Sequence, residues 1–261
     1  MIEEYLSHFN MVYLGLLASL VAGLATGIGG LPVLFTKNIS QKILNSMLGF
    51  AAGIMLAATS FSLIIPAISY GGGGVKGASI AFFGIILGGF FLDSIDRYFP
   101  NTNLLSGSID ENPNLKRIWL FATAITLHNF PEGLAVGVGF GNGDVLNGMS
   151  LAIAIGLQNI PEGLAVALPF VREGVNKWKA VGIALATGLV EPVGGILGAG
   201  LVQISRPLLP VFLAFAAGAM LFVISYEIIP ESQKDAMFSK LSSHALLLGF
   251  VIMMFLDNVL G

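Results

Sequence analysis

Residues 127–136 read Leu-His-Asn-Phe-Pro-Glu-Gly-Leu-Ala-Val, and residues 157–166 repeat the phrase as Leu-Gln-Asn-Ile-Pro-Glu-Gly-Leu-Ala-Val. Both copies lie inside apolar segments, so each places a carboxyl group and a helix-disturbing proline where a lipid-facing helix would be uniformly apolar. An ionisable side chain at the centre of a membrane helix costs about 2.5–3.5 kcal/mol even on a translocon scale. Two such groups at matching positions predict a buried site that holds something charged.

The rest of the chain has the composition of a membrane protein. Of its 261 residues, 55% are apolar and 10% are charged, and its mean hydropathy is +0.86, whereas a soluble domain carries about 25% charged residues. The apolar runs are continuous and do not alternate as barrel strands do. An all-α integral membrane protein is therefore predicted, with the lipid bilayer as a partner. The scattered basic residues indicate no nucleic-acid partner, and the absence of cysteine removes thiolates as metal ligands.

Eight transmembrane helices are predicted, because a span needs about 20 apolar residues. The predicted spans are residues 11–35, 43–69, 78–99, 118–140, 146–170, 178–204, 207–230 and 243–260. The longest connection is the loop 100–117, and residues 1–261 form one transmembrane domain. Glycines four residues apart, such as Gly23 and Gly27, Gly84 and Gly88, and Gly194 and Gly198, predict close helix packing.

The basic residues predict the orientation, because Lys and Arg favour cytoplasmic loops. If the N-terminus lies outside, only Lys76 and Arg206 of the twelve basic residues fall on the outer side, which leaves ten in cytoplasmic loops. Both termini are then extracytoplasmic, loop 100–117 is cytoplasmic, and the protein lies in the cell membrane. Glu3 and Glu4 replace the basic residues that a cleaved signal peptide would begin with, so none is expected.

The predicted spans show an internal symmetry. Residues 48–56 read LGFAAGIML and residues 213–221 read LAFAAGAML, and both segments continue to an Ile-Ile-Pro that ends at Pro66 or Pro230. Gly, Ala and Leu recur by chance in membrane helices, but the shared Phe-Ala-Ala-Gly-x-Met-Leu argues against chance. Spans 1–3 and 6–8 are therefore predicted to be inverted repeats around spans 4 and 5, a 3+2+3 arrangement typical of transporters.

The fourth span brings potential metal ligands to one helix face. His128 and Glu132 are four residues apart, and Asn129 is three residues before Glu132, so the three side chains can converge. Pro131 has no amide hydrogen, so it kinks the helix and frees the carbonyl oxygen of Leu127.

The fifth span repeats this design with Gln158, Asn159 and Glu162, and Pro161 frees the carbonyl oxygen of Leu157. The sixth span adds Glu191, which is followed by a proline, and the second span adds Met55. Together these side chains form a nitrogen- and oxygen-rich set that suits a divalent transition metal. Four further polar residues are candidates for the transport pathway: Ser62, Asp93, Glu227 and Asp257.

Each of these residues also has a structural interpretation. A lone intramembrane histidine is more often a packing residue, a lone glutamate can be a proton site or an interhelical tether, and Met55 can simply fill the core. Glu227 and Asp257 can lie at helix ends. The repeated combination at 128–132 and 158–162 favours a metal site, at which protons should compete with the metal and weaken its binding as the pH falls.

The two phrases resemble those of the ZIP (Zrt/Irt-like protein) metal transporters, and the Gln158 form is similar to the GufA-type bacterial branch. The resemblance covers essentially the whole chain. It implies movement of Zn²⁺, and also Cd²⁺, Fe²⁺, Mn²⁺ or Co²⁺, toward the cytoplasm as substrate, with no cofactor. It further implies an elevator motion of spans 1, 4, 5 and 6 against spans 2, 3, 7 and 8, and a homodimer.

The resemblance also implies a binuclear metal site. Residues that match the first site are His128, Glu132, Gln158, Glu162, Glu191 and Met55, and those that match the adjoining site are Asn129 and Asn159, with Glu132 and Glu162 shared. This chain departs from many members at three places. Gln158 stands where they have histidine, Asn159 stands where some have a carboxylate, and loop 100–117 contains no histidine.

Two other functions are alternatives to transport. An intramembrane zinc metalloenzyme is the main alternative, since bound zinc can activate water. The sequence contains no His-Glu-x-x-His, so we do not expect an enzyme. A metal-gated signalling protein would need an output domain, and the sequence does not indicate one.

Overall fold

The structure is a computed structural model that describes residues 9–98, 113–141 and 143–260, and all regular elements in these ranges are helical. Residues 99–112, which make up most of the predicted loop 100–117, lie outside the described residues. The end of that loop is corrected, because α7 (Pro113–Gly141) already begins at Pro113. A proline suits the first turn of a helix, where no amide hydrogen is needed.

The first three predicted spans are helical as expected. The first consists of α2 (Met11–Gly30) and the short α3 (Pro32–Phe35). The second consists of α4 (Gln41–Ala58), the π-helix η1 (Thr59–Ile64) and α5 (Ile65–Tyr70), and the third is α6 (Gly74–Tyr98). Three consecutive glycines with positive φ, Gly72 to Gly74, make the tight turn before α6.

The remaining spans follow the same order. α7 is followed by α8 (Val145–Arg172), and the sixth span consists of α9 (Lys177–Gly188) and α10 (Glu191–Ile204). After the 3₁₀ turn η3 (Arg206–Leu208), the seventh span consists of α11 (Leu209–Val223), the π-helix η4 (Ile224–Ile228) and α12 (Ile229–Gln233). The last helix is α13 (Ser239–Leu260).

Membrane-spanning character is clear in most of these helices. Among the described residues, seven helical stretches are long and apolar enough to cross a membrane, and α7 is the predicted span that is not among them. α7 has 29 residues, which is ample length, but its polar side chains at 128, 129 and 132 lower its hydropathy. The chain is thus an all-helical, multi-pass membrane protein.

Two features of the helices were not predicted. The predicted span 178–204 is divided between Gly188 and Glu191, where α9 ends and α10 begins. Spans 2 and 7 contain π-helical turns in which the amide of Ile65 donates to Ser60 and that of Ile229 donates to Ile224. In both cases the next residue is a proline, Pro66 or Pro230, whose missing amide already interrupts the α-helical pattern.

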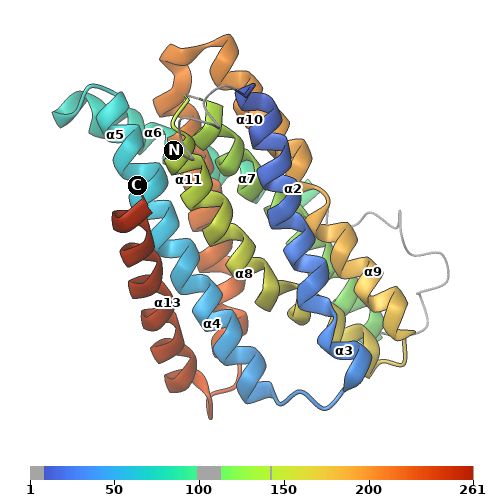
Figure 1. Ribbon diagram of the computed structural model, residues 1–261. Helices are drawn as coiled ribbons and strands as arrows, with labels where there is room; N and C mark the ends of the chain where they lie inside the picture. Colours follow the sequence, from blue (N-terminus) through green and yellow to red (C-terminus); the bar gives the residue numbers. More distant parts are fainter. Residues whose placement is uncertain (1–8, 99–112, 142, 261) are drawn as a thin grey trace.

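The helices pack in two groups (Figure 1). One group, which we call the inner bundle, contains α2, α7, α8, α9 and α10, and α2 and α7 each pack against the other four helices. In the other, which we call the wall, α4 packs against α13 and α6 packs against α11. The two groups meet mainly where α8 contacts α4 and where α7 contacts α11.

The glycines predicted at helix contacts do lie there. A Cβ added at Gly23 would overlap the carbonyl oxygen of Gly188, and one added at Gly88 would overlap that of Phe215. Helix backbones therefore touch directly, within the inner bundle in the first case and within the wall in the second, which confirms the predicted packing role.

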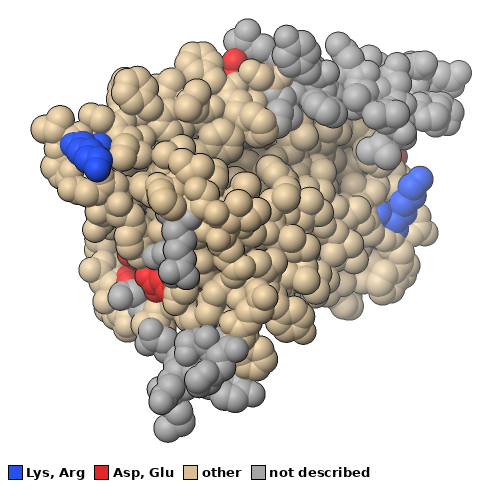
Figure 2. All heavy atoms as spheres, turned by 90° about the horizontal axis from the view of Figure 1, so that it is seen from above, with Lys and Arg blue, Asp and Glu red and all other residues tan. Residues whose placement is uncertain are grey.

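The two ends of the molecule differ in the chain ends and helix connections that they contain. α2 begins and α13 ends at the upper end in Figure 1, while the α3–α4, α8–α9 and α12–α13 connections lie at the lower end. Figure 2 looks onto the upper end and shows few charged side chains.

Candidate metal centre

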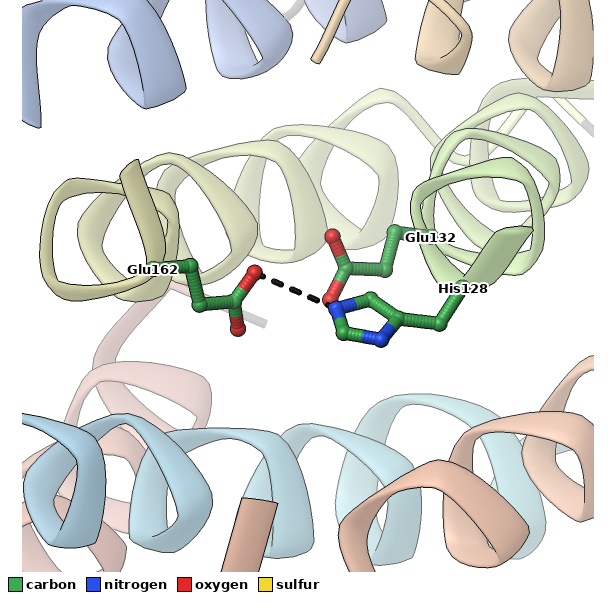
Figure 3. Close-up of side chains that lie close together, drawn as sticks. All are labelled: His128, Glu132 and Glu162. Carbon is green, nitrogen blue, oxygen red and sulfur yellow. Dashed lines mark hydrogen bonds and ion pairs between the residues drawn. The ribbon is translucent and has the colours of Figure 1, made fainter. Parts of the chain in front are cut away.

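His128 and Glu132 of α7 and Glu162 of α8 point toward one another in the interior (Figure 3). One ligand atom of each lies within 4.8 Å of the others, and the three side chains are at most 2% exposed. His128 Nε2 is 3.4 Å from Glu162 Oε2. The predicted convergence of the two phrases is therefore observed.

The two phrases interact reciprocally. The imidazole of the first phrase, His128, faces the glutamate of the second, and the amide of the second phrase, Gln158, donates to Oε1 of Glu132 in the first. α7 and α8 run without interruption through Pro131 and Pro161, so both prolines lie inside α-helices. His128 of α7 therefore contacts α8, and Gln158 of α8 contacts α7.

The break between α9 and α10 positions Glu191. It is the first residue of α10, and its Oε1 accepts a hydrogen bond of 2.7 Å from Asn159 Nδ2. The same amide also donates to the carbonyl oxygen of Ala22 in α2, at 2.8 Å. Asn159 of α8 thus connects α2 and α10 by hydrogen bonds. Its contact with Glu191 links this carboxyl group to the second phrase.

Glycines allow these helices to approach so closely. A Cβ added at Gly133 would overlap the carbonyl oxygen of Glu191, and one added at Gly163 would overlap that of Thr26. The glycine of each phrase therefore sets the distance to a neighbouring helix, α10 or α2.

The cluster contains many buried polar atoms without partners. Every carboxyl or amide residue predicted as a ligand has one buried side-chain oxygen with no hydrogen-bond partner: Asn129, Glu132, Gln158, Asn159, Glu162 and Glu191. Buried polar groups are normally satisfied, so each exception needs an explanation. Oxygen atoms around one imidazole are suitable ligands for a divalent cation.

The other predicted residues are more dispersed. Met55 is buried in α4 within the apolar core, so its role as a ligand stays a prediction. Ser62 of η1 donates to Asp257 of α13, which joins two helices of the wall. Asp93 of α6 lines an apolar groove together with residues of α11, such as Phe222.

Glu227, predicted only as a residue of the transport pathway, contacts His128 directly. Its Oε2 lies 3.2 Å from Nδ1 of His128, and its side chain is 16% exposed. Glu227 is part of the π-helix η4, and the direction of its side chain could not be predicted from helical spacing alone. The proline three residues later, Pro230, was the available signal of an irregular helix there.

A cavity of about 380 Å³ lies between α4, α7, α8 and α12, toward the lower end of the molecule. Its lining includes Glu173 and Lys234 at the helix connections, and Phe121 and Ala165 further along α7 and α8. Ala165 is less than one helical turn from Glu162. The cavity therefore leads from the lower end to the neighbourhood of the cluster.

The fold and the site define a class: a multi-pass helical membrane protein with a buried, oxygen-rich polar centre. Comparison with known proteins shows which family within this class the chain belongs to. The family model described as ZIP Zinc transporter matches residues 106–257. The chain is 45% identical over 252 residues to the zinc transporter GufA of Myxococcus xanthus, covering 95% of this chain and 99% of that protein. It is 39% identical to the zinc transporter ZIPB of Bordetella bronchiseptica, covering 97% and 84%, and 33% identical to the human zinc transporter ZIP11, covering 97% and 98%.

The chain therefore belongs to the ZIP family, in its GufA-type branch, as the sequence predicted. This is a family of transporters and not of enzymes, and the metalloenzyme alternative has no support from these relatives.

Proposed function

We propose that the protein moves Zn²⁺ across the cell membrane toward the cytoplasm, through a site near the bilayer midplane between α7 and α8. The observation that carries this proposal is the buried convergence of His128, Glu132 and Glu162. Six buried oxygen atoms of the predicted ligands, two of them on these glutamates, have no hydrogen-bond partner. Several relatives are named zinc transporters, which supports zinc as the substrate. Cd²⁺, Fe²⁺, Mn²⁺ and Co²⁺ are further candidates, because such sites follow a general affinity order.

In the proposed site, the ion leaves its water shell and binds between the two phrases. His128, Glu132, Gln158, Glu162 and Glu191 would hold the first ion, with Met55 as an additional ligand. Asn129 and Asn159 would hold a second ion, with Glu132 and Glu162 as bridges. The contact between Asn159 and Glu191 supports this arrangement, because it connects the residues of the two sites.

The movement that we propose is an elevator-type motion of the inner bundle against the wall. The tight packing within each group and the smaller contact between them support it. The inner bundle corresponds to spans 1, 4, 5 and 6, and the wall to spans 2, 3, 7 and 8 of a single domain, 1–261. The matching π-helical turns of spans 2 and 7 support the inverted repeats of the 3+2+3 arrangement.

The proposed direction of release follows from the cavity and the basic residues. Lys37, Arg172, Lys177 and Lys234 lie in or beside the connections at the lower end. Basic residues favour the cytoplasmic side, so the cavity would open to the cytoplasm and both termini would lie outside. A homodimer is the proposed assembly.

Uptake by proteoliposomes tests the proposal. Zn²⁺ entry would be compared between the wild type, Glu132→Ala and Glu162→Ala, with Cd²⁺, Mn²⁺ and Fe²⁺ measured in parallel. Asp235→Ala is the control, because Asp235 lies in the turn before α13, outside the spans. We expect both glutamate variants to lose uptake and the control to keep it. Wild-type uptake by the two glutamate variants would refute the site.

A further inference from the structure

We propose that Glu227 is a positioning residue for His128. Its carboxylate accepts a hydrogen bond from Nδ1–H of the imidazole and thereby directs the lone pair of Nε2 toward Glu132 and Glu162. The inference rests on the proposed metal site, and it assigns Glu227 to that site without making it a ligand.

The geometry of the imidazole carries the first step. The two ring nitrogens of His128 face two different glutamates. Nε2 lies 3.4 Å from Glu162 Oε2 in the inner bundle, and Nδ1 lies 3.2 Å from Glu227 Oε2 in η4 of the wall. The ring therefore spans the boundary between the two helix groups.

The chemistry of the ring carries the second step. A neutral imidazole has one nitrogen that donates a proton and one that offers a lone pair. An ion held by Glu132 and Glu162 lies on the Nε2 side of the ring, so Nε2 must offer the lone pair and Nδ1 must carry the proton. Metal-binding histidines nearly always donate their second N–H to a carboxylate, a carbonyl or a water. Glu227 is the carboxylate at that position.

The surroundings of Glu227 carry the third step. Its neighbour Tyr226 is 61% exposed, while Glu227 is only 16% exposed and is directed inward. The cavity between Glu227 and His128 has room for about one water molecule, at about 10 Å³, and its other lining residues are apolar. The carboxylate is thus held against the ring in a place where solvent cannot readily replace it.

The nitrogen that binds the metal can be observed directly. The chain contains three histidines, so ¹⁵N-histidine labelling gives a simple NMR spectrum, and a His128→Gln sample assigns the signal. In zinc-loaded wild type we expect a protonated Nδ1 and a metal-bound Nε2. A metal-bound Nδ1 would overturn the inference.

A double-mutant cycle tests whether Glu227 acts through His128. Zn²⁺ affinity is measured for purified protein by competition with a chelator. Glu227→Ala should weaken binding about 10–100-fold, whereas Glu227→Gln, whose amide oxygen can still accept the hydrogen bond from Nδ1–H, should stay within about threefold of wild type. In a His128→Ala background, Glu227→Ala should change the affinity by less than about threefold. Equal losses in both backgrounds would make Glu227 an independent ligand and overturn the inference.

Controls separate this inference from the proposed site. Tyr226→Phe changes the neighbouring exposed side chain and should bind zinc like wild type. If His128→Ala and Glu132→Ala bind like wild type, the proposed site itself is wrong. If both weaken binding but Glu227→Ala does not, only the role of Glu227 is wrong. Because Glu227→Gln keeps size and shape, a loss of binding in that variant too would also contradict the inference.

Discussion

At the scale of single residues, Glu132 and Glu162 occupy equivalent positions in the two phrases but have different partners. Glu132 accepts a hydrogen bond from Gln158, and Glu162 faces the imidazole of His128. The difference arises from one substitution between the phrases, His128 in the first and Gln158 in the second. The two phrases therefore contribute matching glutamates to the site, but only the first phrase contributes an imidazole nitrogen, from His128.

This asymmetry predicts the effect of Gln158→His. A second imidazole would face Glu132, and imidazole is a better ligand for zinc than a neutral amide, so we expect Zn²⁺ affinity to rise about tenfold relative to Mn²⁺ affinity. Chelator competition with both metals measures this change. Gln233→His is the matched control, because Gln233 is exposed on α12. An unchanged ratio of the two affinities would argue against Gln158 as a ligand.

The ligand set also predicts a pH dependence. Carboxylate and imidazole groups must release their protons before they bind a metal, so protons and Zn²⁺ compete. Affinity should therefore be highest at the alkaline end of a range from about pH 8 to pH 5 and should fall as the pH is lowered. Equilibrium binding to purified protein measures it, and a constant affinity would contradict the proposal.

The sequence predicted the residues of the site better than their contacts. Helical spacing was enough to bring His128 and Glu132 to one face, and the repetition of the phrase was enough to pair α7 with α8. Spacing could not show that Gln158 reaches Glu132 or that Asn159 holds Glu191, because such contacts depend on how neighbouring helices are rotated. The inward turn of Glu227 could not be predicted for the same reason.

At the scale of helices, the π-helical turn η4 determines where Glu227 points. Ile229 donates to Ile224, so one residue more than usual is included in the turn. Pro230 follows directly and cannot supply the amide that a regular α-helix would need. We therefore expect the orientation of Glu227 to depend on Pro230, three residues later in the chain.

We therefore expect Pro230→Ala to weaken zinc binding about tenfold, because a regular helix would turn Glu227 away from His128. The measurement is chelator competition, together with a thermal unfolding scan to show that the variant is folded. Pro207→Ala in η3 is the control, since Pro207 is exposed and precedes α11. If Pro230→Ala bound zinc as tightly as wild type, the π-helical turn would not be needed for Glu227 to support zinc binding.

The eight helical spans followed from hydropathy, but the interruptions within them did not. A search for apolar runs treats residues 178–204 as one segment, because Leu189 and Val190 at the break are themselves apolar. Pro192 lies in the first turn of α10 and was the signal for a new helix start there. A proline alone would not have been a sufficient signal, because α7 and α8 continue through Pro131 and Pro161.

At the scale of the whole molecule, the inner bundle and the wall touch near the upper end through Tyr70 of α5 and Asp144 at the start of α8. The tyrosine hydroxyl lies 3.4 Å from Asp144 Oδ2. The cavity near Lys234 lies at the other end. In the elevator motion that we propose, this combination would correspond to a state that is closed at the upper end and accessible from the lower end.

Cross-linking tests whether the two groups move. The chain has no cysteine, so Tyr70→Cys with Asp144→Cys gives a single reactive pair across the groups. Treatment with a bifunctional thiol reagent should abolish Zn²⁺ uptake and leave Zn²⁺ binding intact. Gln233→Cys with Ser243→Cys joins α12 to α13 within the wall, where the two side chains are 3.5 Å apart, and should keep uptake. Equal uptake by both cross-linked proteins would contradict the elevator motion.

The glycines between α7 and α10, and between α8 and α2, have a consequence for how the protein can vary. Each leaves less space than one methyl group between two backbones, so even alanine would force whole helices apart. In a library of single substitutions selected for growth on scarce zinc, Gly133 and Gly163 should tolerate as little change as the side chains that touch the ion.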